Sequence, residues 1–309
     1  MGTPDFAVSS LERLIAEGYE VVGVFTQPDK PKGRKHVLTA PPVKECALLH
    51  GIPVYQPASL KQGEAMPILE ELRPDVIVVA AYGMILRSDV LSFPKYGCIN
   101  VHASLLPKYR GAAPINACIR AGETETGVTT MLMDEGLDTG DMLLAESVPI
   151  GADETAGELF DRLAVLGGRV LIRTLEALEA GTLSRTPQND AESCYAGMLS
   201  KADSPVDWEQ PAQRVHDHIR GLSPWPSAVT ERDGKPVKVH RSRMATDLSD
   251  TDTGCALPGE LFARQGRLFV RCGDGAYVEL LEVQPLGSRA MDAGAYLLGH
   301  EVHEKDRFS

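Results

Sequence analysis

Long apolar runs and paired cysteines are both missing from this chain of 309 residues. No stretch approaches the roughly 20 consecutive apolar residues that a membrane-spanning helix needs, and the first residues do not have the pattern of a secretory signal. The six cysteines are scattered and include no Cys-x-x-Cys pair, which argues against a disulfide framework and a zinc site. We therefore expect a cytoplasmic protein with reduced thiols, no membrane partner and no metal.

Positive charge is also scarce, because 31 Lys and Arg stand against 43 Asp and Glu, for a formal net charge of −12. Neither residues 1–199 nor residues 200–309 are basic overall, so the usual electrostatic footprint of a nucleic-acid-binding protein is absent. Salt screens charges beyond roughly 8–10 Å, however, so local basic patches decide whether RNA binds. The length allows two domains of ordinary size.

Apolar strands alternate with helical segments in the first part of the chain. This alternation indicates an α/β fold with β-α-β units and a doubly wound, mostly parallel, Rossmann-like sheet. A long helix is expected over 153–180, where Leu159, Leu163 and Leu166 share one face and Gly181 follows the end. The expected strands are 20–26, 52–56, 75–81, 97–102, 126–133 and 142–150.

The character of the chain changes after residue 181. Residues 182–203 are polar and read as a linker, and short β segments separated by Gly, Pro and Asp follow, which indicates a small barrel. We therefore expect a first domain at 1–181 and a second at 204–309, with Trp208 and Trp225 in the core of the second. The expected strands there are 236–240, 259–263, 268–271 and 277–283.

The beginning of the chain does not fit a doubly wound sheet. A helix is expected over 5–18, directly after the first few residues, whereas such a sheet has a strand before that turn. We expect Met1 to stand at the end of a strand that this sequence lacks, and its loss to leave a central sheet edge unpaired.

Two short polar motifs carry the chemistry. Asn100 and His102 lie two apart at the end of an expected strand, so their side chains share a face, and Asp138 follows 36 residues after His102. An amide and an imidazole can stabilise an oxyanion while a carboxylate orients the imidazole and relays protons, which suits transfer of a one-carbon acyl group. Taken singly, the motifs also fit a strand end and a polar turn.

Basic residues gather in one exposed segment, at Lys30, Lys32, Arg34 and Lys35, among prolines and a glycine. Such a segment can be a solvated charge run, but cations that contact phosphates also supply most sequence-independent affinity for nucleic acids.

A second basic patch lies within 237–243. Alternation along a strand would place Lys238 and His240 on one face and Arg241 and Arg243 on the other, so a basic stripe on one face is not predicted.

The order of these pieces resembles the folate-dependent formyltransferases, and among them the methionyl-tRNA formyltransferase family, over nearly the whole chain. The segments that carry the resemblance are Gly2-Thr-Pro-Asp-Phe6, Val24-Phe-Thr-Gln-Pro-Asp29, Ala80-Ala-Tyr-Gly83, Cys98-Ile-Asn-Val-His102, Ser104-Leu-Leu-Pro107, Arg110-Gly-Ala-Ala-Pro114, residues 127–140 and Gly221-Leu-Ser-Pro-Trp-Pro226.

The resemblance implies a formyltransferase domain and a C-terminal tRNA-binding barrel of the oligonucleotide-binding (OB) type. It implies 10-formyltetrahydrofolate as the formyl donor, initiator methionyl-tRNA as the acceptor, no metal, and Asn100, His102 and Asp138 as catalytic residues. A monomer is the default expectation.

The resemblance also implies the binding residues. Those expected at the reduced-folate pocket are Tyr82, Gly83, Ile85, Leu86, Ser104, Leu105, Leu106, Pro107, Thr139 and Gly140. Those expected to contact tRNA are Lys30, Lys32, Arg34, Lys35, Lys238 and Arg241, with Arg34 matching the recognition arginine of the family.

Two other functions compete with this interpretation. One is a folate-dependent formyltransferase or hydrolase whose acceptor is a small amine or water. The other is a catalytically idle RNA-binding protein, which the intact set of Asn100, His102 and Asp138 disfavours.

Overall fold

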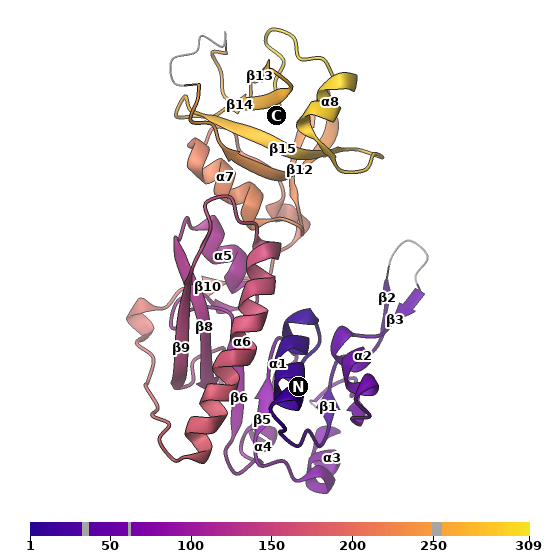
Figure 1. Cartoon of the computed structure of the whole chain (residues 1–309), viewed down its shortest axis with the longest axis vertical. Coiled ribbons are helices and arrows are strands. Elements are labelled where there is room, and N and C mark those ends of the chain that lie inside the picture. The colour runs from indigo at the N-terminus through magenta and orange to yellow at the C-terminus, as the bar shows by residue number, and fades with distance from the viewer. Residues whose placement is uncertain (33–36, 61–62, 249–254) are drawn as a thin grey trace. The chain divides into compact units, whose positions relative to one another are not determined.

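The structure is a computed structural model that describes residues 1–32, 37–60, 63–248 and 255–309 (Figure 1). The chain forms two compact units. The first contains Met1–Gly111, Thr126–Val148 and Phe160–Ala196, and the second contains Ala112–Glu125, Pro149–Leu159 and Gly197–Ser309. The segment 182–203, expected to be a linker, is thus divided between the units, and its part up to Ala196 packs within the first.

Short strands and helices alternate in the first unit, as an α/β fold requires. Its helices are α1 (Asp5–Ala16), α2 (Pro42–Leu49), α3 (Ala65–Leu72), α4 (Ser88–Leu91) and most of α6 (Ala156–Glu179). Its strands are β1 (Val24–Phe25), β2 (Lys30–Lys32), β3 (Val37–Thr39), β4 (Val54–Tyr55), β5 (Ile77–Val79), β6 (Cys98–His102), β7 (Arg110–Gly111), β8 (Glu125–Leu132), β9 (Met142–Pro149) and β10 (Tyr195–Ala196).

The central sheet is mixed beyond β6. Strands β1 and β4 pair in parallel, and so do β5 and β6, as expected. Strand β8 pairs antiparallel with β6, and β9 lies next to β8. The connection from β6 to β8 contains the helix α5 (Pro114–Arg120) of seven residues, which is about 10 Å long.

Helix α6 covers one face of this sheet, and two glycines allow it to lie close. A Cβ atom on Gly167 would be 2.9 Å from Val101 of β6, and one on Gly168 would be 3.1 Å from the Ser9 carbonyl oxygen of α1. The apolar face expected for the helix is confirmed, since Leu163 and Leu166 are buried.

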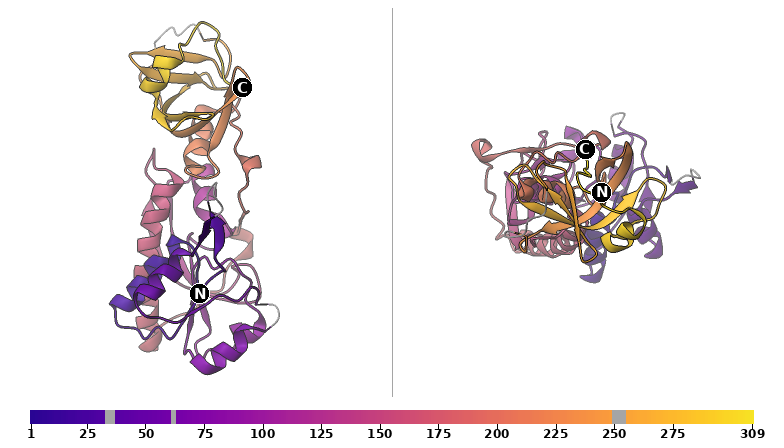
Figure 2. Two further views of the ribbon diagram at one scale, coloured as in Figure 1. Left: turned by 90° about the vertical axis from the view of Figure 1, so that its right-hand side faces the viewer. Right: turned by 90° about the horizontal axis from the view of Figure 1, so that it is seen from above.

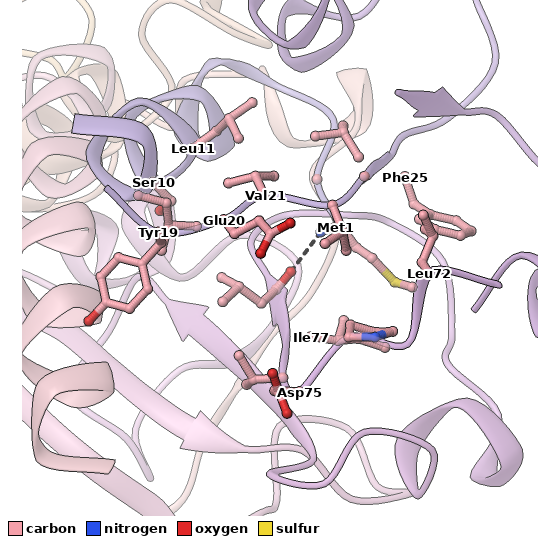
Figure 3. Close-up of a pocket in the computed structure, with 18 of the residues that line it drawn as sticks. Met1, Ser10, Leu11, Tyr19, Glu20, Val21, Phe25, Leu72, Asp75 and Ile77 are labelled. Atoms are coloured by element: carbon pink, nitrogen blue, oxygen red, sulfur yellow. Dashed lines mark hydrogen bonds between the residues drawn. The ribbon is translucent and has the colours of Figure 1, made fainter. Parts of the chain in front are cut away.

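Met1 and Gly2 lie between β1 and β5. The Gly2 amide donates to the Phe25 carbonyl oxygen (3.0 Å), Gly2 forms a parallel bridge with Ala80, and the Met1 amino group donates to the Val78 carbonyl oxygen (2.6 Å). This is where a strand ending at Met1 was expected. A cavity of about 640 Å³ adjoins these residues (Figure 3). Its lining includes Tyr19, Glu20, Val21, Leu72 and Asp75.

The second unit contains α5, an antiparallel sheet and two further helices. Its elements are α7 (Ala212–Gly221), β11 (Ala228–Arg232), β12 (Lys235–Met244), β13 (Leu261–Arg264), β14 (Arg267–Arg271), β15 (Tyr277–Pro285), β16 (Met291–Asp292) and α8 (Ala293–Gly299). The strand order is β11-β12-β15-β14-β13, with β16 beside β15. Sequence analysis did not anticipate α7 or α8.

The last residues of the chain close this sheet into a barrel (Figure 2). Phe308 donates its amide to the Gly259 carbonyl oxygen (2.8 Å) beside β13, and Ser309 exchanges two hydrogen bonds with Glu231 of β11. Both outer strands are thereby paired, and the expected small barrel is confirmed. Trp208 is buried and stacks on Phe308, as expected, but Trp225 is 56% exposed, so its expected core position was wrong.

A buried histidine ties α7 to the rest of the second unit. His216 lies with Nε2 2.9 Å from the Ala152 carbonyl oxygen and Nδ1 2.9 Å from the Ser242 hydroxyl. Because a carbonyl only accepts, Nε2 donates to Ala152, and the neutral ring accepts from the Ser242 hydroxyl at Nδ1. Burial lowers the pKa of His216, and the charge of Arg220 acts in the same direction.

We expect the free energy of unfolding to fall as the pH drops below about 6.5, the ordinary value for histidine, because the unfolded chain then binds a proton that folded His216 resists. Urea unfolding of the full chain at pH 7.5 and 5.5 measures this. In His216→Gln the difference between the two pH values should shrink, whereas His50→Gln, a change at an exposed histidine, should leave it intact. An unchanged difference in His216→Gln would contradict the assignment.

Candidate active site

Strand β6 ends with two polar side chains inside an otherwise apolar environment. All five of its residues are buried, and its neighbours β5 and β8 hold it on both sides. Asn100 stands opposite Met131 and His102 opposite Thr129, so the two polar side chains share one face of the sheet. Only 9% of Asn100 and 6% of His102 are exposed to solvent, which means that each requires polar partners.

Asp138 supplies those partners from the loop between β8 and β9. Asn100 donates through Nδ2 to Asp138 Oδ1 (3.3 Å), and His102 Nδ1 lies 3.7 Å from Asp138 Oδ2. The backbone amide of Gly111 donates to the same Oδ2 (2.8 Å). The structure therefore brings together the three residues that were predicted to be catalytic, with the carboxylate held by a backbone donor.

The histidine ring is oriented by its other nitrogen. His102 Nε2 lies 2.9 Å from the carbonyl oxygen of Tyr109, which can only accept, so Nε2 carries a hydrogen. Nδ1 then faces the Asp138 carboxylate, beyond hydrogen-bond distance.

The loop after β6 is held by a threonine that sequence analysis missed. Thr129 of β8 donates through its hydroxyl to the Ser104 carbonyl oxygen (2.7 Å) and accepts from the Leu106 amide (3.1 Å). The Ser104 hydroxyl donates to the Lys108 carbonyl oxygen (2.7 Å). Ser104 therefore stabilises its own loop, and its buried side chain does not present a free donor.

The residues predicted for the folate pocket differ in their exposure. Buried ones are Tyr82, Leu86, Ser104, Leu106 and Gly140, and open or half-buried ones are Gly83, Ile85, Leu105, Pro107 and Thr139. Ile85 is 82% exposed, and Leu137, next to Asp138, is 57% exposed. The exposed side chains of Ile85 and Leu137 are available to pack against an aromatic ring. The buried predicted residues pack inside the protein and support the loops.

Tyr82 is buried although its hydroxyl has no hydrogen-bond partner among the described residues. Burial raises the pKa of Tyr82 to about 12. Its carbonyl oxygen accepts from the Thr3 hydroxyl and from Gln27 Nε2, which also donates to the Gly83 carbonyl oxygen. Hydrogen bonds thus connect the 82–83 turn to Thr3 near the start of the chain and to Gln27, which lies shortly after β1.

A second carboxylate, that of Asp134, forms hydrogen bonds within the loop that carries Asp138. Asp134 accepts from the Thr139 hydroxyl (2.7 Å) and from the Gly136 amide (3.0 Å). A Cβ atom on Gly140 would lie 1.8 Å from the Leu132 carbonyl oxygen, so this position requires glycine. Asp134 therefore orients the loop, and the Thr139 hydroxyl is occupied.

The first basic segment lies partly outside the described residues, because Arg34 and Lys35 fall in the gap at 33–36. Lys30 is exposed and donates to Gln27 Oε1 (2.6 Å). Lys32 ends β2, which pairs antiparallel with β3. The described part of the predicted basic segment is thus strand β2 of a two-stranded antiparallel sheet.

The second basic patch differs from its expected arrangement. A β-bulge interrupts the pairing of β12 with β15 between Val239 and Ser242, and a bulge shifts the alternation of faces. Lys238, Arg241 and Arg243 are consequently all exposed, with Val239 and Ser242 buried between them, so the expected split over two faces was wrong.

Lys238, Arg241 and Arg243 differ in whether they form ion pairs. Arg241 pairs with Glu158 (2.9 Å), and Arg243 pairs with the buried Glu279 (2.7 Å). Burial alone would raise the pKa of Glu279, but hydrogen bonds from Arg267 and Arg243 hold it below its ordinary value. Lys238 has no such ion pair among the described residues.

Neither a metal site nor a membrane span is found in the described ranges. No group of three or more His, Cys, Asp and Glu side chains there could hold a metal ion. No helix formed by the described residues is both long and apolar enough to cross a membrane.

Comparison with known proteins adds independent information. A family model described as "Formyl transferase" matches residues 1–175, and one described as "Formyl transferase, C-terminal domain" matches residues 198–301. A methionyl-tRNA formyltransferase from Geobacter metallireducens is 49% identical over 300 residues, which are 97% of this chain and 94% of that protein. One from Alkaliphilus metalliredigens is 50% identical over 305 residues, 98% and 95% of the two chains.

Solved structures share the fold at lower identity. WlaRD, a sugar 3N-formyl transferase crystallised with dTDP and 5-N-formyl-THF, aligns with a TM-score of 0.69 at 19% identity over 93% of this chain and 97% of that one. An N-formyltransferase from Helicobacter canadensis, in complex with folinic acid and dTDP-3-aminofucose, aligns with a TM-score of 0.64 at 18% identity over 92% and 97%.

Proposed function

Since the chain belongs to the methionyl-tRNA formyltransferase family, we propose that it transfers the formyl group of 10-formyltetrahydrofolate to the amino group of methionyl initiator tRNA. The observation that carries the proposal is the contact of Asn100 and His102, at the end of β6, with the Asp138 carboxylate. An amide, an imidazole and a carboxylate in contact are the groups that acyl transfer to an amine needs.

Each residue has a role that follows from its position. We assign Asn100, whose Nδ2 has a second hydrogen besides the one donated to Asp138, and the His102 ring as the donors to the formyl oxygen as it gains negative charge. Asp138 favours the protonated ring and accepts the proton that the attacking amine must lose. In the balanced reaction the amine nitrogen bonds to the formyl carbon, the bond from that carbon to N10 breaks, and one proton passes from the new ammonium to N10.

The loops beside this cluster suit a reduced folate. Ile85 and Leu137 offer exposed apolar surface for its rings. The turn at Gly83 and the Asp138 loop would supply backbone groups to the pocket in this proposal. The buried Tyr82 hydroxyl, which lacks a partner among the described residues, is a polar atom that a bound donor could satisfy.

The β2–β3 hairpin and the barrel favour tRNA over a small amine as the acceptor. Lys30 and Lys32 lie on β2, and Arg34 and Lys35 follow them in the sequence. The bulge in β12 puts Lys238 on the exposed face with Arg241 and Arg243. The three catalytic groups come from one chain, so the reaction requires no second copy, and we propose a monomer. An acceptor carried on tRNA places the reaction in the cytoplasm.

The test is formyl transfer from 10-formyltetrahydrofolate, with charged initiator and elongator methionyl-tRNA compared in parallel. We expect transfer to the initiator and little to the elongator. Equal transfer to both would overturn the assigned acceptor, and transfer only to a small amine, such as an amino sugar, would support the competing function.

Arg34→Ala is expected to weaken initiator tRNA binding and to reduce the slope of log affinity against log salt by about 1, because one phosphate contact is lost. Filter binding at several salt concentrations measures both quantities. Lys95→Ala removes an exposed cation that lies over the Tyr96 ring and should change neither. If the affinity for tRNA is unchanged in Arg34→Ala, this arginine does not belong to the interface.

A further inference from the structure

Besides a long contact of 4.0 Å with the Met131 sulfur, Gln188 makes three hydrogen bonds to the segments that build the catalytic cluster. Its Nε2 donates to the carbonyl oxygens of Asp138 and Gly140, both at 2.8 Å, and its Oε1 accepts from Arg110 Nε at 3.0 Å. Both amide hydrogens and the amide oxygen are therefore used. Gln188 lies between β9 and β10, in the polar segment that sequence analysis assigned to a linker.

The backbone at Asp138 needs such support. Its φ angle is +53°, in the left-handed region that residues with a side chain seldom occupy. The side-chain amide of Gln188 satisfies two carbonyl oxygens, one at this residue and one two residues later. The turn would otherwise have to find other donors for both, and the position of the Asp138 carboxylate depends on the turn.

Arg110 extends the same connection to the opposite side of the carboxylate. Its guanidinium is held by Gln188 and by Asp190 (2.8 Å), and β7 is fixed by its parallel pairing with β10. The next residue, Gly111, donates its amide to Asp138 Oδ2 (2.8 Å). Gln188 thus contacts both the backbone that carries the carboxylate and the segment that supplies its backbone donor.

We propose that Gln188 is a positioning residue, which holds the Asp138 carboxylate at the edge of the His102 ring. The inference rests on the proposed function, because it assigns a role within that reaction. Gln188 acts only through Asp138 and the Arg110 segment, and it has no contact with the reacting atoms.

Two substitutions separate the parts of this role. Gln188→Ala removes all three hydrogen bonds, and Gln188→Glu keeps the shape and the acceptor for Arg110 but sets a carboxylate against two carbonyl oxygens. We expect either change to lower kcat by about 10- to 100-fold, since displacement of a catalytic group by about 1 Å costs that much. KM for both substrates should change far less. Gln210→Ala removes a glutamine bonded to Asp207 (2.9 Å) and should leave kcat unchanged.

The combination with Asp138→Asn distinguishes positioning from a general structural effect. If Gln188 acts through Asp138, then Gln188→Ala should cause almost no further loss of kcat in the Asp138→Asn background. Losses that multiply would overturn the proposal, and so would wild-type kcat in Gln188→Glu.

A second measurement does not depend on catalysis. Amide hydrogen exchange in residues 136–141 should be faster in Gln188→Glu than in the wild-type chain, while exchange in the barrel should stay the same. Unchanged exchange in the loop would overturn the inference even if formyl transfer is observed. If exchange is faster in Gln188→Glu but the wild-type chain shows no formyl transfer, the proposed function is overturned. The role of Gln188 in holding the Asp138 loop would still be supported.

Discussion

Asn100→Ala is expected to lower the rate constant of formyl transfer by about 10²–10³-fold, the usual cost of removing one oxyanion donor. The amide of Asn100 is the neutral donor of the cluster, and it lies on a strand that is paired on both sides and buried throughout. Such a donor is already in place before the formyl oxygen gains charge. Its loss should therefore affect the chemical step more than the binding of either substrate.

Single-turnover transfer with saturating donor and initiator methionyl-tRNA measures this step. Asn116→Ala is a matched control, because it removes an amide that donates to the Gly221 carbonyl oxygen (2.7 Å) in the second unit. The control should keep the wild-type rate constant at a temperature well below its unfolding transition. A wild-type rate in Asn100→Ala would remove this residue from the mechanism.

Asp138→Asn is expected to reduce kcat by about 10²–10⁴-fold, the range in which positioned acid–base groups contribute. The carboxylate accepts hydrogen bonds from Asn100 and Gly111 and faces His102. An asparagine would have to turn an NH₂ group toward one of these donors. It would also remove the negative charge that favours the protonated imidazole and the acceptor for the proton of the amine.

The comparison with Asp134→Asn makes this prediction specific. Asp134 lies on the same loop, but its carboxylate accepts from Thr139 and Gly136 and so holds the loop without facing His102. Asp134→Asn should therefore reduce kcat far less than Asp138→Asn does. Measuring kcat of both variants across pH 6–9 tests this difference. Equal losses would mean that loop order, and not the Asp138 carboxylate, limits the rate.

Local patterns were sufficient for most elements of the first unit. Strand β6 and helix α6 follow directly from an apolar run and from leucines at helical spacing. Where the strand ends, the positions of Asn100 and His102 follow from alternation alone. That Asp138 lies near His102 was predicted only from the resemblance to the formyltransferases, because 36 residues separate the two and no periodicity extends that far.

Pairing between distant segments decided what sequence analysis missed. The antiparallel direction of β8 was seen only in its pairing with β6, and the common face of Lys238 and Arg241 depends on a bulge that appears only when β12 meets β15. Helix α7 carries buried polar residues such as His216, whose partners come from Ala152 and Ser242. Apolar residues are accordingly few in this helix.

The sequence by itself determined the class of chemistry, since an amide, an imidazole and a carboxylate at these positions suit acyl transfer and resemble a formyltransferase. Only the tertiary structure decided how the carboxylate is held. Gln188 is 50 residues from Asp138 along the chain and lies in a polar segment without periodicity. A hydrogen bond depends on where two atoms end up after folding, and a pattern of neighbouring residues does not record that.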